Sequence, residues 1–162
     1  MRTLILMRHA SAEGFSPDGD KGRHLTPQGR REAAEVGTHL AGKGVQLALV
    51  SAATRARQTW ECLGIAAPAE FMEALYNCGT VTLAQRIGEV PDEVQVLLVV
   101  AHSPGVPSLS AELAYASSPQ EADDLQCWFP TAAYSEFSLE GSWSDLADDE
   151  SLRLAGVQRI GY

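Results

Sequence analysis

Three apolar runs in this chain are each followed by side chains that can bind an anion or attack its central atom. Arg8 and His9 follow the first run, Arg55 lies shortly after the second, and His102 comes after the third. Guanidinium groups match phosphate oxygens with two parallel hydrogen bonds. A neutral imidazole nitrogen can act as a nucleophile. Brought together, these groups would suit binding and transfer of a phosphoryl group.

The plainer interpretation is that these are ordinary structural residues. A single histidine at the end of a buried strand is more often a hydrogen-bonded core residue than a nucleophile. However, Arg8 would be a costly charge in a buried position without an anionic partner. The same residue types also recur after three different runs, which favours a functional site.

The three runs themselves predict the elements that would gather these side chains. Residues 3–7, 46–50 and 94–100 are apolar without alternation, as is typical of parallel strands covered on both faces. Ligands of open α/β sheets bind at the carboxyl ends of such strands. We therefore expect the site side chains to meet in one crevice.

A helical signal follows each of the three predicted strands, and a fourth follows the segment of residues 66–77. Leu25-Thr26-Pro27 has the residues typical of a helix start, and further helices are expected from about Thr54, from a cap at Thr80, and over residues 104–116. Residues 66–77 carry Pro68 and little periodicity, which indicates a loop.

Two more strands are expected near the carboxyl terminus, at residues 132–138 and 152–160. The acidic segment 145–150 joins them and has the composition of a solvated turn. Alternating strands and helices predict an α/β fold: a single three-layer α/β/α sandwich with a mostly parallel sheet, in one domain over residues 1–162.

Composition limits the classes of partner. The 162 residues carry 12 Lys and Arg against 21 Asp and Glu, a formal net charge of −9, which argues against binding nucleic acid or anionic membranes. The apolar start is too short for a secretion signal, and Cys62, Cys78 and Cys127 show no disulfide or zinc pattern. We therefore expect a cytoplasmic protein with reduced thiols.

Several motifs resemble those of one family in the same order along the chain. Leu6-Met7-Arg8-His9-Ala10 resembles the R-H-G signature of the histidine phosphatase superfamily, which has the phosphoglycerate mutase-like fold. Arg23-His24-Leu25-Thr26 with Gly29, and SAATRARQT over residues 51–59, resemble two further segments of that family. Glu73-Ala74-Leu75 and Val99-Val100-Ala101-His102 complete the set. The short chain is most similar to the small phosphohistidine phosphatase branch.

The resemblance implies a role for each of the gathered residues. His9 would be the nucleophile and would carry a phosphohistidine intermediate, while Arg8, Arg55 and His102 surround the transferred group. These roles agree with phosphoryl transfer, in which positioning and electrostatic stabilisation supply most of the catalysis. Neither a metal ion nor another cofactor is expected, because the arginines supply the positive charge.

Two more residues receive roles from the resemblance, and three do not. Arg23 would bind substrate, and Glu73 would stand where many family members keep an acid for an alcohol leaving group. Arg57 is expected to point away from Arg55 on the same helix. His24 and His39 lack metal-ligand spacing and are expected at the surface.

The implied activity is hydrolysis of phosphohistidine on a protein partner, as in signal transduction. A phosphatase of small phosphorylated metabolites would use the same site, and a phosphopeptide-binding module without catalysis is the alternative from another class. Ala101-His102-Ser103-Pro104-Gly105 resembles an esterase nucleophile elbow. Pro104 lacks the N–H that the oxyanion hole needs, and no histidine follows His102, so an esterase is not expected.

Overall fold

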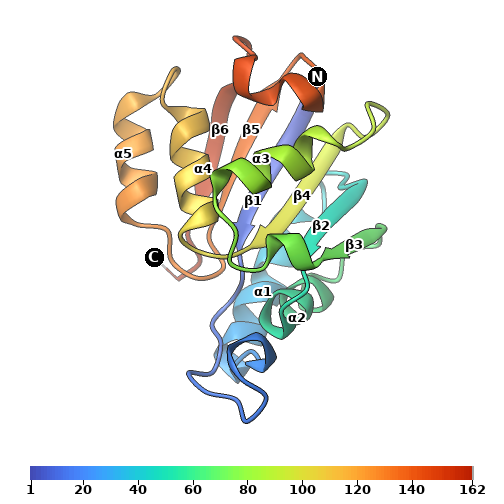
Figure 1. Ribbon diagram of the computed structural model, residues 1–162, viewed down its shortest axis with the longest axis vertical. Helices are drawn as coiled ribbons and strands as arrows, with labels where there is room; N and C mark the ends of the chain where they lie inside the picture. Colours follow the sequence, from blue (N-terminus) through green and yellow to red (C-terminus); the bar gives the residue numbers. More distant parts are fainter. Residues whose placement is uncertain (162) are drawn as a thin grey trace.

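A mixed sheet forms the centre of the protein, whose computed structural model describes residues 1–161. Its strands are β1 Arg2–Arg8, β2 Leu47–Ser51, β3 Ala69–Met72, β4 Val96–Ala101, β5 Tyr134–Leu139 and β6 Arg153–Gln158. The spatial order is β3-β2-β4-β1-β5-β6 (Figure 1). Strands β1 to β4 pair in parallel, whereas β5 and β6 run antiparallel to their neighbours. The expected mostly parallel sheet is confirmed.

Helices cover both faces of this sheet. They are α1 Pro27–Leu40, α2 Thr54–Leu63, α3 Thr80–Gly88, α4 Gly105–Ala114 and α5 Pro119–Cys127. One core cluster packs α3, α4 and α5 on one face, and a second packs α1 and α2 on the other. Figure 1 shows α3 and α4 crossing in front of the strands. The expected three-layer α/β/α sandwich is confirmed.

Side chains of β1 alternate between the two cores, as the pleat of a strand requires. Leu4 and Leu6 belong to one cluster, and Ile5 and Met7 to the other. Each of these four side chains is fully buried. The uninterrupted apolar run of β1 thus reflects a strand covered on both faces.

The carboxyl ends of β1 and β4 lie side by side. Arg8 pairs in register with Ala101, so the residues that follow, His9 and His102, leave the sheet at the same level. In Figure 1 these strand ends face the loop that leads into α1. This loop contains the short 3-10 helix Asp20–Gly22.

Three elements were not expected from the sequence. Within the segment predicted to be a loop, residues 69–72 form the edge strand β3 and Glu73–Leu75 form a 3-10 helix. Helix α5 was also missed. Only Ala122 and Leu125 of α5 are buried, so its apolar stripe is too sparse to show a period.

Two local predictions were wrong. Thr80 is the first residue of α3, whose cap is Gly79 without a side-chain hydrogen bond. The acidic segment is not simply a solvated turn, because it overlaps the 3-10 helix Trp143–Asp148, in which Trp143 and Leu146 are buried. Burial of these two side chains fixes the connection between β5 and β6.

No helix within residues 1–161 combines the length and the apolar character that a bilayer crossing needs.

Candidate functional site

Two buried imidazoles lie together at the carboxyl ends of β1 and β4. The backbone N–H of His9 donates a hydrogen bond of 3.0 Å to the carbonyl of Ala101, the residue directly before His102. The ring centroids of His9 and His102 are 5.3 Å apart. Only 6% of His9 and 4% of His102 is exposed. The sheet therefore brings together two residues that are distant in sequence, as expected.

A hydrogen bond to the backbone defines which nitrogen of His9 is available. Nδ1–H donates to the carbonyl oxygen of Ala10 at 2.7 Å, which leaves the lone pair of Nε2 free. Ala10 is held in turn, since its N–H donates to Oγ1 of Thr59 at 3.0 Å. Burial lowers the pKa of His9 to about 3, and His102 and Arg55 add to this effect. The ring is therefore neutral at pH 7.

His102 presents one bonded and one unpartnered nitrogen. Its Nε2 lies 2.7 Å from Oγ of Ser51, the last residue of β2. Nδ1 is buried and has no hydrogen-bond partner. When the Ser51 hydroxyl donates to Nε2, Nδ1 carries the proton and can donate to an anion. Burial and the charge of Arg55 lower the pKa of His102 to about 4, so this ring is also neutral at pH 7.

The guanidinium groups of Arg8 and Arg55 are oriented by backbone carbonyls. Nη1 of Arg8 donates to Phe129 at 3.0 Å, in the loop between α5 and β5. Nη1 of Arg55 donates to the carbonyl of Asp20 at 2.9 Å, and only 4% of Arg55 is exposed. Burial and the charge of Arg55 lower the pKa of Arg8. The two cations thus lie close enough to repel each other, which an anion would relieve.

Unsatisfied donors are concentrated at this site. Among residues 1–161, six buried side-chain N or O atoms lack a hydrogen bond, and four of them belong to expected site residues. The four atoms are Nε of Arg8, Arg23 and Arg55, and Nδ1 of His102. Leaving a buried donor unpaired costs about 1–3 kcal/mol. An oxyanion has enough acceptor lone pairs to satisfy several of these donors at once.

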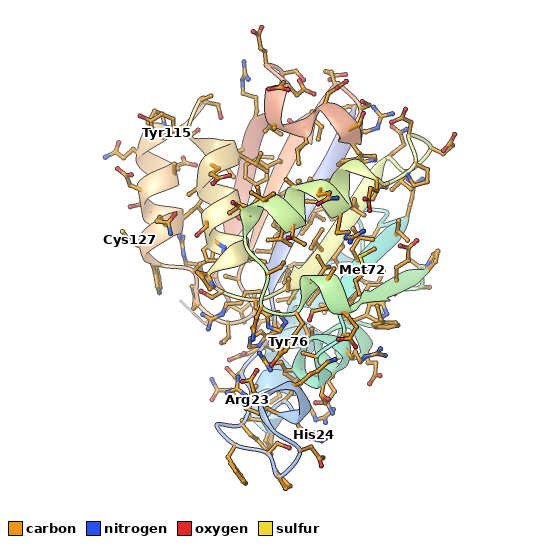
Figure 2. All side chains as sticks on the ribbon, viewed as in Figure 1. Arg23, His24, Met72, Tyr76, Tyr115 and Cys127 are labelled. Carbon is orange, nitrogen blue, oxygen red and sulfur yellow. The ribbon has the colours of Figure 1, made fainter. Side chains whose placement is uncertain are left out.

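Arg23 and Glu73 lie at the edge of this group rather than within it. Nε of Arg23 is 3.4 Å from Oδ1 of Asp20, and Figure 2 shows Arg23 near Tyr76 at the same end of the sheet. The Glu73 side chain is 72% exposed and forms an ion pair with Lys21. The structure therefore places Arg23 beside the arginine pair and Glu73 at the rim.

The three residues that were expected outside the site lie outside it. Arg57 donates from Nε to the carbonyl of Ala52 at 3.0 Å, and its guanidinium stacks 4.3 Å from the ring centre of Phe71. His24 lies at the surface beside Gln58, and His39 is exposed on α1. No three His, Cys, Asp or Glu side chains within residues 1–161 are grouped as metal ligands.

Four features of the site could not be recognised beforehand. They are the carbonyl of Ala10, the hydroxyl of Ser51, and the side chains of Asp20 and Tyr76, which bond to each other. Tyr76 packs edge-on against His102, with ring centroids 5.7 Å apart. Asp20 stands three residues before Arg23, but nothing in a loop rich in Gly, Pro and Asp distinguishes it from its neighbours.

Comparison with known proteins decides the family. Residues 4–85 match the family model of the histidine phosphatase superfamily (branch 1). The chain belongs to this superfamily. An uncharacterised protein of Mycobacterium tuberculosis (strain H37Rv) is 39% identical over 146 residues, which cover 86% of this chain and 91% of that protein.

Solved structures of the superfamily share the fold. A candidate phosphohistidine phosphatase SixA from Nakamurella multipartitia is 33% identical, with a TM-score of 0.90 over 99% of this chain and 97% of that chain. The protein histidine phosphatase SixA in complex with tungstate is 24% identical, with a TM-score of 0.77 over 96% and 95% of the two chains, which shows the fold alone. The resemblance read from the motifs is confirmed, and the chain is a phosphatase of the histidine phosphatase superfamily.

Proposed function

We propose that this protein hydrolyses phosphohistidine on a partner protein through a covalent phosphohistidine intermediate on His9. The observation that carries the proposal is the state of the His9 ring. Nδ1–H is bonded to Ala10, so Nε2 is a neutral nucleophile, and unpartnered donors of Arg8, Arg55 and His102 belong to the same end of the sheet. This arrangement provides an attacking atom together with a binding place for the group it attacks.

In the first step, Nε2 of His9 attacks phosphorus and the bond from phosphorus to the substrate nitrogen breaks. The electron pair of that bond goes to the leaving imidazole, which departs neutral because its other nitrogen is protonated. The phosphorylated His9 ring becomes cationic, and the Ala10 carbonyl that accepts from Nδ1 stabilises this charge. Arg8 and Arg55 stabilise the equatorial oxygens of the loose transition state.

In the second step, water attacks phosphorus in line and the bond from phosphorus to Nε2 breaks. The electron pair returns to Nε2, and phosphate leaves with the water oxygen. The low pKa of His9 suits this step. The site stabilises the unprotonated ring, and this is the form in which His9 leaves phosphorus. The free imidazole is then ready for another turnover.

The position of Glu73 favours phosphohistidine over phosphate esters. An alkoxide leaving group needs a proton donor, whereas a protonated phosphoimidazole does not. Glu73 is largely exposed and forms an ion pair with Lys21. Small phosphate esters remain the second candidate because Glu73 does stand at the rim, and Glu73→Gln should then reduce ester turnover while leaving phosphohistidine turnover unchanged.

A cytosolic location accompanies this proposal. Cys62, Cys78 and Cys127 are free thiols in the structure, as a reducing compartment would keep them. A phosphorylated signalling protein of the same compartment is the proposed partner.

Turnover assays test the proposal. A phosphohistidine-bearing protein, sugar phosphates and p-nitrophenyl phosphate are each supplied to the wild type and to His9→Ala. We expect phosphohistidine to be turned over fastest, with no turnover by His9→Ala. Faster turnover of a sugar phosphate would favour a metabolite phosphatase. Binding of the phosphoprotein without release of phosphate by the wild type would favour a binding module.

A further inference from the structure

Asp20 is a carboxylate in direct contact with cations of the proposed phosphoryl site. Its Oδ2 lies 3.3 Å from Nη2 of Arg55, and its Oδ1 lies 3.4 Å from Nε of Arg23. The same Oδ2 accepts a hydrogen bond of 2.5 Å from the hydroxyl of Tyr76. One acidic side chain therefore faces two of the three arginines that the sequence assigned to phosphate.

Asp20 is held more closely by Tyr76 than by either arginine. The hydrogen bond from Tyr76 is short, whereas both contacts to arginine are long for charged hydrogen bonds. Half of the Asp20 side chain is exposed, while that of Arg55 is 4% exposed. The carboxylate is thus anchored by Tyr76 at the mouth of the site and reaches inward to a buried cation.

We propose that the Asp20 carboxylate is an internal counter-anion of Arg55 and Arg23, which the phosphoryl group displaces and which then opposes retention of the phosphate product. The inference rests on the proposed function, because it concerns the same site. It assigns Asp20 as a positioning and affinity-setting residue that acts through the two arginines.

The physical reason is the balance of charge in the site. The buried guanidinium group of Arg55 and the partly exposed groups of Arg8 and Arg23 would hold a phosphate dianion tightly, and slow product release would then limit turnover. A carboxylate that stays near these groups after it is displaced weakens phosphate binding, because it competes for the arginines and repels the phosphate. The low pKa of Asp20, caused first by the Tyr76 hydrogen bond and then by the arginines, keeps this charge in place at neutral pH.

The substitution Asp20→Asn isolates the charge from the geometry. Arg55 is oriented by the backbone carbonyl of Asp20 at 2.9 Å, which the substitution retains. The amide oxygen of asparagine can still accept from Tyr76. Asp18→Asn is the matched control, because it removes one charge from the same exposed loop and Asp18 forms no ion pair with Arg23 or Arg55.

The experiment measures the dissociation constant of inorganic phosphate by calorimetry, and its product-inhibition constant, for wild type, Asp20→Asn and Asp18→Asn. Thermal unfolding of each protein confirms that it is folded. We expect Asp20→Asn to bind phosphate about tenfold more tightly, with a similar drop in the inhibition constant and in KM, and Asp18→Asn to match the wild type. The gain should shrink between about 0.05 and about 0.5 M salt, because screening weakens the repulsion.

Unchanged or weaker phosphate binding by Asp20→Asn would overturn the inference, because a purely structural role of Asp20 predicts weaker binding. Equal tightening by Asp18→Asn would also overturn it, since overall charge would then be the cause. In both cases phosphate binding by the wild type would leave the proposed function standing. No binding of phosphate by any of the three proteins would overturn the inference, and it would reject both proposals if the wild type also failed to turn over phosphohistidine.

Discussion

The chemistry of the site depends on a single hydrogen atom, the one on Nδ1 of His9. The carbonyl of Ala10 accepts it, and this leaves Nε2 as the free nitrogen. The sequence predicts that His9 and His102 face a shared crevice, because both follow apolar strands. It cannot predict which backbone carbonyl fixes the ring, since any residue type supplies the same carbonyl. For the same reason, the sequence indicated His9 as the proposed nucleophile and the cations around it, but not the orientation of its ring.

The depressed pKa values of the two rings lead to a prediction at this scale. Both rings are buried, so protonation becomes favourable only near pH 3 for His9 and near pH 4 for His102. We expect their imidazole carbon resonances in NMR to stay at the neutral position as the pH is lowered from 8 to about 5, past the usual value of about 6.5. His9→Ala assigns the resonances. A midpoint near 6.5 for either ring would contradict the burial that the structure assigns to it.

The two central arginines lead to the second prediction. Arg8→Ala and Arg55→Ala should each lower kcat by about 10²-fold or more, because each removes a donor directed at charge in the transition state. The matched control is Arg57→Ala, on the same helix as Arg55 but stacked on Phe71, which should keep near wild-type kcat. Steady-state kinetics on the preferred substrate checks this. Normal rates for Arg8→Ala or Arg55→Ala would remove the basis for the proposed site.

At the scale of elements, the strands that carry the site were the ones that the sequence predicted well. Residues 3–7, 46–50 and 94–100 lie within or next to β1, β2 and β4, because strands covered on both faces leave an unbroken apolar run. Strand β3 was missed because it lies at the sheet edge and all four of its residues are partly or fully exposed. Burial, rather than intrinsic propensity, decided which elements could be predicted from the sequence.

Helix α1 packs directly on the loop that carries the Ala10 carbonyl. A Cβ added to Gly29 would lie 2.0 Å from the backbone oxygen of Ser11, so the helix can approach this loop only with glycine at that position. Thr26 caps the same turn by accepting from the Gly29 N–H at 3.0 Å, as its sequence position predicted. The start of α1 thus supports the segment that orients His9.

Gly29→Ala should therefore affect both stability and activity. We expect it to lower the free energy of unfolding by about 1–3 kcal/mol, the usual cost of overpacking, and to lower kcat because the loop of Ala10 must move. Gly42→Ala serves as control, since nothing lies within 4 Å of its added Cβ. Urea unfolding and steady-state kinetics measure the two effects. Equal stability of the two variants would mean that α1 does not approach the loop as closely as described.

At the scale of the whole molecule, the protein is strongly acidic, but three of its arginines form a local positive region. The net charge is −9, yet Arg8, Arg23 and Arg55 all belong to one end of the sheet. A net negative charge disfavours the general binding of anions, so the group of three arginines is a local exception. Composition alone argued against polyanionic partners, whereas the local positive region could form only when the fold brought separate strand ends together.

Oxyanions that resemble a transferring phosphoryl group should bind and stabilise the protein. Vanadate and tungstate should inhibit competitively, and tungstate at about 100 times its dissociation constant should add about 2.7 kcal/mol to the stability of the folded state. Thermal unfolding with and without tungstate measures this gain, and the double variant His9→Ala/Arg8→Ala should reduce it.

EDTA should leave activity unchanged. Loss of activity in EDTA with recovery in magnesium would argue against a site in which arginines alone supply the positive charge.

Trapping of the phosphoenzyme tests the central claim most directly. The enzyme is mixed with labelled substrate, quenched within milliseconds in base, and digested, and the labelled peptide is sequenced by mass spectrometry. The account predicts acid-labile, base-stable phosphate on Nε2 of His9, and none in His9→Ala. Phosphate on any other residue, or turnover by His9→Ala at the wild-type rate, would contradict it.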